Sequence, residues 1–490
     1  MQVSPIPLAT GIECPFNSRV SRCDAFGVKS EARYWPVMRP LCLAAIALAL
    51  INAGGAPAAE MSAGVARIKI TPPMPFQLSG YSNRTNLATE VRTDLWAKAI
   101  ALQDGDGRRA VIVTTDLIGL PREISENVAG RAIERHGLAR SQIILNSAHV
   151  HSGPMVWPNL PNMFDLTPGQ IAPLEQYARS LSDNLTGLIE AAIANLAPAK
   201  LAIAHDSADF AINRREPTAK GFKLGVNPSG PTDHDVPVLI VHTPDGRLRA
   251  VLFAYACHNT TLTGTWNIID GDYAGAAQRK VELSHPGCTA LFMMLCGGDQ
   301  NPNPRNTIEL AEQHGQTLAA AVERALASDS KPVRPPIRSA HHLIRLPFAT
   351  HSRETFVQEL QDKNVARQRR ARMMLAAYDR GQPVIDVAYP VQAIRFGDDL
   401  CLVGLGGEVV VDYALRAKRE FPGENLVVAG YCNNVMCYIP TVRILREGGY
   451  EPCDSMIFYG QPGPFAESIE ETIFQTIRQV MREVGASAQD

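Results

Sequence analysis

The sequence of 490 residues has no marked excess of charge of either sign, with 47 lysines and arginines against 49 aspartates and glutamates. It therefore lacks the broad basic surface that binding to nucleic acid requires. Internal repeats and long linkers are also missing. We expect an ordinary globular protein with a substantial core and no nucleic-acid partner.

Closely paired cysteines of the C-x-x-C type are absent, which excludes the usual structural zinc site. Seven of the ten cysteines follow residue 60, and this odd number leaves at least one thiol unpaired. Cys432, Cys437 and Cys453 are close enough in sequence for one disulfide, although spacing alone does not determine the pairing.

Only one long apolar run without charge is present, at residues 41–59. Its core is too short to span a bilayer, Arg39 precedes it, and small residues follow it, a pattern typical of a secretory signal peptide. We therefore predict that residues 1–59 are an N-terminal extension and signal peptide, with translation starting at Met38. Residues 60–490 would then form one mature domain, located in the periplasm or secreted.

Short apolar runs alternate with amphipathic segments after residue 60, which predicts an α/β fold with a mixed β-sheet core surrounded by helices. The expected buried strands are residues 110–116, 142–147, 236–242, 250–258, 290–296, 400–406 and 426–430. The expected helices are residues 167–196, 305–327, 352–380 and 464–484. The proline-rich residues 331–336 are either a domain boundary or a loop between two halves of one domain.

Polar residues follow several of these runs, and ligands collect beyond the carboxyl ends of strands in open α/β sheets. His149 and His151 come just after one run, His258 ends a second, and Glu408 follows a third. Each alone has an ordinary explanation, such as a hydrogen-bonded core histidine or a glutamate that favours the start of a helix. Together, two histidines and a carboxylate from separate strand ends are the ligand set of a catalytic zinc site.

Several motifs, in chain order, resemble those of the neutral/alkaline non-lysosomal ceramidase family. They are QLSGYS (77–82), SAHVHSGP (147–154), INR (212–214), FAYACH (253–258), GGE (406–408), YIPT (438–441) and GGYE (448–451). The most specific are the H-x-H element and the spacing of twelve between Tyr438 and Tyr450. The resemblance implies the catalytic fold of that family.

The resemblance also implies a bound Zn²⁺. Its expected ligands are His149, His258, Glu408 and Tyr438. Zinc held in this way activates water near neutral pH and polarises a substrate carbonyl.

Five further residues fall on the family's other active-site positions. They are Gly80, Ser82, His151, Arg214 and Tyr450. The resemblance places His151 towards the substrate, where it would carry protons to the leaving amine. Arg214 and Tyr450 would stabilise the tetrahedral oxyanion.

Two features depart from the family pattern. The family element GDxSPN carries a serine linked to catalysis, whereas GDQNPN at residues 298–303 has Asn301 in that place. Family members also end in an immunoglobulin-like β domain, and the roughly fifty residues after Tyr438 leave no room for one. We therefore expect the catalytic domain without a C-terminal immunoglobulin-like domain.

We interpret the sequence as a zinc-dependent amidohydrolase that cleaves an N-acyl amide resembling ceramide. Its partner would be a small-molecule or lipid amide, and a lipid substrate would bring peripheral contact with a membrane. Two alternatives stay open: a zinc hydrolase for an ester, peptide or glycan linkage, and a non-catalytic metal-containing binding protein. The joint presence of His151, Arg214 and Tyr450 argues against the last, because simple binding needs no proton-transfer group.

Export predicts cleavage between Ala56 and Met61, because the apolar core and its exit of small residues occur there. Mass analysis of the N-terminus of secreted material checks this. An active cytoplasmic protein that keeps Met1 would contradict it.

Overall fold

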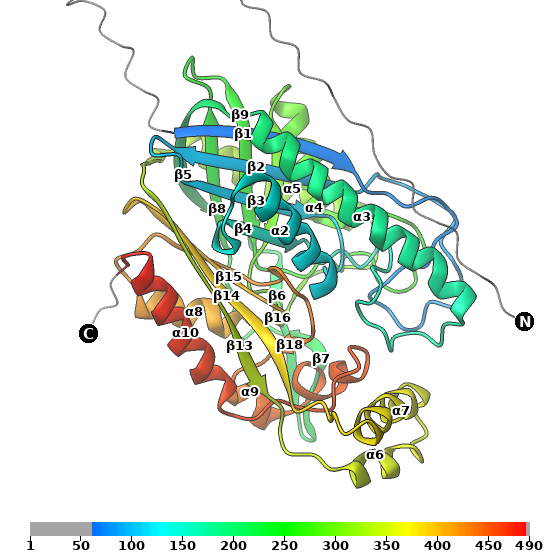
Figure 1. The fold of residues 1–490 in the computed structure, drawn as a ribbon. Helices are drawn as coiled ribbons and strands as arrows, with labels where there is room; N and C mark the ends of the chain where they lie inside the picture. The colour runs from blue at the N-terminus through cyan, green and yellow to red at the C-terminus, as the bar shows by residue number, and fades with distance from the viewer. Residues whose placement is uncertain (1–60, 487–490) are drawn as a thin grey trace, which may run out of the picture. The chain divides into compact units, whose positions relative to one another are not determined.

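Two β-sheets pack face to face between layers of helices (Figure 1). This computed structural model describes residues 61–486, so the predicted extension and signal peptide at residues 1–59 lie outside the described residues. The prediction of an α/β fold with a mixed-sheet core surrounded by helices is confirmed.

Within residues 61–486, the larger sheet has nine strands, in the order β10-β9-β8-β5-β1-β2-β3-β4, with β12 paired to β5. β9 and β10 are parallel, as are β3 and β4, whereas the other pairs are antiparallel. The proline-rich residues 331–336 thus begin as a strand of this sheet. The bounds are β1 (Met61–Lys69), β2 (Trp96–Asp104), β3 (Arg109–Thr115), β4 (Ile143–Ser147), β5 (Ala197–Ser207), β8 (Asp235–His242), β9 (Leu248–Tyr255), β10 (Thr289–Met294) and β12 (Lys331–Val333).

The second sheet has the order β13-β14-β15-β17, and its last two strands are parallel. Two small sheets, β11-β6-β7 and β16-β18, complete the strands of the described region. The bounds are β6 (Ala211–Thr218), β7 (Gly221–Asn227), β11 (Gln300–Pro302), β13 (Ile337–Pro347), β14 (Asp386–Phe396), β15 (Leu400–Leu405), β16 (Glu408–Val409), β17 (Leu426–Ala429) and β18 (Tyr438–Ile439).

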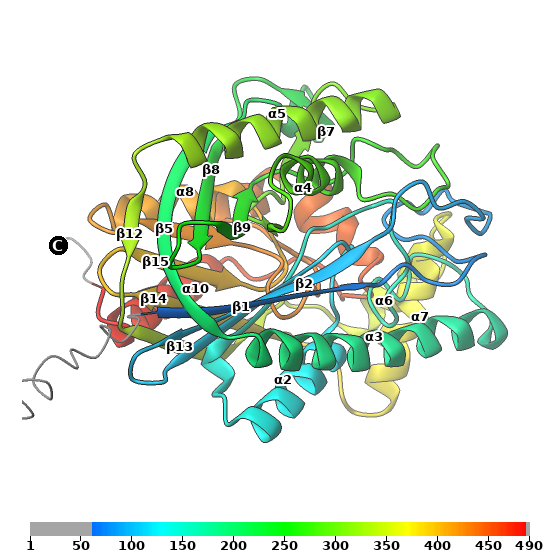
Figure 2. The same cartoon turned by 90° about the horizontal axis from the view of Figure 1, so that it is seen from above.

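Helices cover the outer face of each sheet. α2 and α3 lie over β1 to β3, α4 and α5 lie over the part of the same sheet that holds β5, β8 and β10, and α8 and α10 lie against the second sheet (Figures 1 and 2). The bounds are α2 (Arg122–His136), α3 (Pro168–Ala194), α4 (Asp272–Ser284), α5 (Ile308–Ala327), α6 (Arg353–Glu359), α7 (Val365–Asp379), α8 (Val411–Glu420), α9 (Val442–Glu447) and α10 (Ile469–Glu483). Short turns are η1 (Arg140–Gln142), η2 (Tyr450–Asp454) and η3 (Ser455–Ile457).

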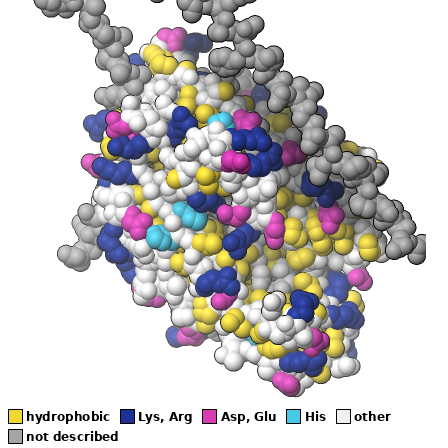
Figure 3. Space-filling view, viewed as in Figure 1, with side chains coloured by type: hydrophobic (Ala, Val, Ile, Leu, Met, Phe, Trp, Pro, Cys, Tyr) yellow, Lys and Arg dark blue, Asp and Glu magenta, His cyan; other side chains and the backbone are white. Residues whose placement is uncertain are grey.

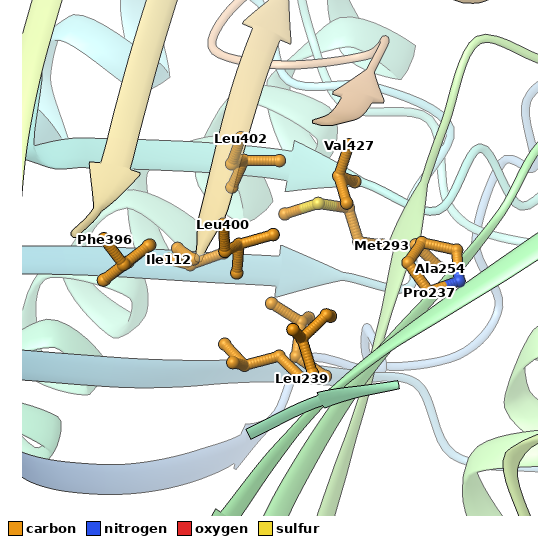
Figure 4. A pocket seen from close by; sticks show the side chains of 11 residues that line it. Ile112, Pro237, Leu239, Ala254, Met293, Phe396, Leu400, Leu402 and Val427 are labelled. Carbon is orange, nitrogen blue, oxygen red and sulfur yellow. The ribbon is translucent and has the colours of Figure 1, made fainter. Parts of the chain in front are cut away.

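The central strands are apolar throughout because both of their faces are buried. Successive side chains of a strand point to opposite faces. In β2, Ala99 and Ala101 therefore pack with the helices, while Ile100 and Leu102 pack with the second sheet. Between the sheets, apolar side chains from both, including Ile112 and Leu402, line a small cavity of about 30 Å³ (Figure 4).

One expected helix is wrong, and the disulfide that the cysteine spacing allowed is not formed. The segment at residues 352–380 forms two helices, α6 and α7, since Asn364 ends the connection between them and its side chain caps α7 by accepting from the Ala366 and Arg367 amides. The seven cysteines within residues 61–486 are all free thiols, so Cys432, Cys437 and Cys453 form no disulfide.

The surface carries charges of both signs, intermixed over the face drawn in Figure 3, as the formal net charge of -2 leads one to expect. In the described part of the chain, each helix is too short or too polar to cross a bilayer.

Candidate metal centre

The predicted ligands come together where strands of both sheets end. His149 follows β4 and His258 follows β9, and a bridge between Val150 and Asn259 holds the two segments side by side. Glu408 begins β16 and is the direct register partner of Tyr438 in the parallel β18. The four residues lie on different strand ends, and the packing of the two sheets determines their separation.

A buried asparagine ties these strand ends together. Asn146, inside β4, donates to the carbonyl oxygens of Met294 and Gly430 over 3.1 and 2.9 Å and accepts from the Met294 amide over 2.9 Å. One side chain thereby links the ends of β4, β10 and β17. A polar residue that directly follows the apolar run Ile143–Leu145, while still inside the buried strand, was the available clue to this role.

Three imidazoles and one carboxylate form a tight cluster. The Nε2 atom of His149 lies 2.9 Å from Nε2 of His151 and 2.9 Å from Oε2 of Glu408, which is 3.1 Å from Nε2 of His258. The three histidines each offer a ring nitrogen within 4.8 Å of the others. All four side chains are buried or nearly so.

Backbone carbonyls determine which ring nitrogens face the cluster. The Nδ1 atom of His149 lies 2.6 Å from the oxygen of Ile118, that of His258 2.8 Å from Gly297, and that of His151 3.2 Å from Gly80. A carbonyl oxygen can only accept, so each Nδ1 carries the proton and each neutral ring turns the lone pair of Nε2 inwards.

With neutral rings, this arrangement brings the lone pairs of His149, His151 and Glu408 to one place, which is unfavourable unless a cation lies among them; the lone pair of His258 also faces Arg214. Two or three imidazoles with one carboxylate are typical zinc ligands, and the backbone contacts at Nδ1 are the supporting bonds that such ligands have in metal sites. The donor set therefore fits a metal ion, and zinc suits its chemistry.

Protonation of His151 and His258 is opposed by their surroundings. Burial, together with Arg214 and His149, lowers the pKa of His258 to about 3. Burial also holds the pKa of His151 well below its usual range. Burial alone would raise the pKa of Glu408, but His149 and His258 outweigh it and hold that pKa well below normal. Burial thus favours the neutral imidazoles of His151 and His258, the form in which histidine binds a metal.

Arg214 and two tyrosines line the other side of the cluster. Arg214 donates through Nη2 to the hydroxyl of Tyr438 over 2.9 Å, and its Nη1 lies 3.1 Å from Nε2 of His258. The hydroxyl of Tyr438 is itself 3.1 Å from that nitrogen. The rings of Tyr438 and Tyr450 are 5.7 Å apart, and Arg214 lies against both.

The loop that carries QLSGYS closes over His151. Gly80 has a φ of 87°, and a Cβ atom there would lie 2.4 Å from Nδ1 of His151, so only glycine fits. The ring of Tyr81 lies 5.0 Å from that of His151. Ser82 is exposed, and none of the hydrogen bonds found within residues 61–486 joins its side chain to the cluster.

Two residues that support the site were not foreseen from the sequence. The hydroxyl of Tyr459 donates to Oε1 of Glu408 and orients the carboxylate. Arg84, buried beneath the loop, donates to the carbonyl oxygens of Ser79, His151 and Trp266. The closeness of Arg84 to the QLSGYS motif was a usable clue, whereas Tyr459 lies far in sequence from every strand end considered.

The fold and the site together define an α/β protein with a candidate metal centre at the meeting point of two sheets. Residues 61–335, more than half of the chain, match the family model described as neutral/alkaline non-lysosomal ceramidase, N-terminal. The chain belongs to this family, as its motifs led us to expect.

Curated relatives share limited identity with the chain. The neutral ceramidase of Mycobacterium tuberculosis is 26% identical over 219 residues, which cover 41% of this chain and 33% of the relative. Neutral ceramidase 1 of Arabidopsis thaliana is 24% identical over 303 residues, covering 59% of this chain and 38% of the relative. The match thus spans only about a third of the length of these proteins.

The neutral ceramidase from Pseudomonas aeruginosa has a similar solved structure, with a TM-score of 0.67 at 18% identity over 88% of this chain and 76% of the other. A structure described as ceramidase complexed with C2 gives a TM-score of 0.68 at 18% identity, over 88% of this chain and 77% of the other. Both support the fold.

We expect the purified protein to retain one divalent metal ion after zinc exposure and dialysis, and His149→Ala or His258→Ala to abolish this.

Tyr459→Phe should weaken metal affinity by about 10-fold to 100-fold, because Glu408 loses its orienting hydrogen bond. Elemental analysis and competition with a chelating dye measure both effects. His205→Ala, a histidine paired with Asp235 outside the cluster, is the matched control and should keep the metal. A wild-type protein that stays metal-free would contradict the assignment.

Proposed function

We propose that this protein is a zinc-dependent hydrolase that cleaves an N-acyl amide of the ceramide kind. The observation that carries the proposal is the convergence of His149, His151, His258 and Glu408 directly beside the guanidinium of Arg214. Family membership supports the choice of an amide bond.

His149, His258 and Glu408 would hold the ion, with Tyr438 beside them. A bound zinc ion supplies an activated water and polarises the substrate carbonyl. The sequence assigned His151 to the substrate, yet its Nε2 lies as close to His149 as Glu408 does, so this side chain is equally placed to be a third histidine ligand. Its proton-transfer role stays a prediction.

The chain's own groups account for the remaining chemistry. Arg214 is held close to the cluster, where a guanidinium stabilises the negative charge that develops on the carbonyl oxygen. Tyr450 lies against Arg214, and burial raises the pKa of its hydroxyl, so that the group stays protonated and would be able to donate to the oxyanion. With Nδ1 bonded to Gly80, Nε2 of His151 has its lone pair free; it would accept the proton released by the attacking water and then pass that proton to the leaving amine.

Export to the periplasm or the medium is part of the proposal, supported by the apolar run at residues 41–59. A lipid amide would be met at a membrane surface, and a smaller amide in solution.

The first test is a screen of the mature, zinc-loaded protein against N-acyl amides, esters and acetylated sugars. We expect hydrolysis of at least one amide, lost on chelation and in His258→Ala, and kept in His205→Ala. Activity on esters or sugars without any on amides would show that the enzyme cleaves a different bond from the one proposed. Metal binding without turnover of any tested substrate would favour the alternative of a non-catalytic metal-containing binding protein.

Asn301 provides a second test, of substrate preference. Its Oδ1 lies 3.3 Å from Nη1 of Arg214 and 3.4 Å from the hydroxyl of Thr260. A carboxamide is longer than a serine side chain and cannot act as a nucleophile, so we expect short polar N-acyl amides to be preferred over long-chain ceramide.

Asn301→Ser should raise kcat/KM on ceramide relative to the short amide by about tenfold, since an unpaired buried polar group costs roughly 1–3 kcal/mol. The measurement is kcat/KM on both substrates for both proteins. Robust ceramide hydrolysis by the wild type, unchanged in Asn301→Ser, would show that this position does not determine preference.

A further inference from the structure

Two consecutive arginines turn towards the same buried carboxylate. In a regular strand, Arg214 and Arg215 would point to opposite faces. In β6 the pairing with β7 shifts register between Asn213 and Arg215, and such a bulge re-aims side chains. Both guanidiniums consequently reach Glu451.

Glu451 is placed by an unusual turn. It is the second residue of the π-helical turn η2, which begins at Tyr450, and only 1% of its surface is exposed. Its Oε1 accepts from Nε of Arg214 over 2.9 Å, and its Oε2 accepts from Nη1 of Arg215. The turn thus presents Tyr450 to one side of Arg214 and its neighbouring carboxylate to another.

The contact with Glu451 uses Nε of Arg214 and leaves its two terminal nitrogens free to contact the metal cluster. Because Nε is bonded to the carboxylate, the two terminal nitrogens face His258 and Tyr438. Within residues 61–486, Glu451 is the one carboxylate that forms an ion pair with Arg214. A planar guanidinium bound at one edge has little freedom to turn.

Arg215 does not depend on Glu451 in the same way. It also pairs with Glu447 over 3.0 Å and donates to the carbonyl oxygen of Gly448 over 2.9 Å. Loss of Glu451 would leave Arg215 with a carboxylate and Arg214 without one.

We infer that Glu451 is a positioning residue that aims the guanidinium of Arg214 at the metal cluster. The role of Arg214 in turnover rests on the proposed function. The orientation of its guanidinium does not, because it is a property of the protein without substrate. The competing explanation is that Glu451 only neutralises the positive charge of Arg215 and does not orient Arg214.

The experiment compares Glu451→Gln and Glu451→Asp with Glu447→Gln, the control that removes a carboxylate from Arg215, and from the exposed Arg443, but none from Arg214. Crystal structures of the three variants should show Arg214 displaced from Tyr438 in both Glu451 variants and unmoved in the control. This result needs no substrate, so it is independent of whether amide hydrolysis is the correct activity. An unmoved Arg214 in both Glu451 variants would overturn the inference.

Kinetics on the best substrate of the screen add a second criterion. We expect kcat to fall about a hundredfold in Glu451→Gln, with KM and metal content within about threefold of wild type, since a small misplacement of a catalytic group is costly. Glu451→Asp keeps the charge but shortens the reach, so it should lose a comparable factor while folding normally. If Glu451→Gln does not fold, the kinetics of Glu451→Asp test the inference in its place.

The double variant Arg215→Met with Glu451→Gln removes the second positive charge. If Glu451 served only to neutralise Arg215, this variant would recover wild-type kcat, and the inference would be wrong. If Glu451 aims Arg214, kcat stays about a hundredfold low.

Discussion

The site depends on one electrostatic constraint, which is that acceptor atoms of opposing side chains are held face to face. Nε2 of His149 and Oε2 of Glu408 are only 2.9 Å apart, and the backbone bond from Nδ1 of His149 to Ile118 prevents its ring from turning away. Such a contact is stable when a positive charge lies between the partners. Burial lowers the pKa of His258 to about 3 and holds that of His151 well below its usual range, so these two rings stay neutral and leave their lone pairs for a metal ion.

The two packed sheets supply the rigidity that this contact needs. Asn146 links the ends of three strands, and β16 and β18 hold Glu408 beside Tyr438. Backbone strain is found here as well, because His149 and Tyr431, whose rings lie 4.6 Å apart, adopt φ values of 61° and 56°. Left-handed backbone at residues other than glycine is costly and is commonly kept where it orients functional groups.

The sequence allowed seven strands to be predicted, because strands buried on both faces leave uninterrupted apolar runs, such as residues 110–116 for β3 (Arg109–Thr115). The other strands of the described region, among them the long β1, β5, β13 and β14, were not predicted. It did not show the break between α6 and α7, where a cap at Asn364 overrides a continuous helical pattern. The strand-end rule and the family motifs together located the cluster. Tyr459 and Glu451 act through contacts that span 51 and 237 residues of sequence, respectively, and nothing local in their segments indicated those partners.

The most direct test of the account is anomalous diffraction at the zinc absorption edge from crystals of the zinc-loaded protein. The account predicts one strong peak among the Nε2 atoms of His149 and His258 and the carboxylate of Glu408. A peak elsewhere in the chain, or an ordered protein in which His149 and Glu408 keep their present contact without any ion between them, would contradict it.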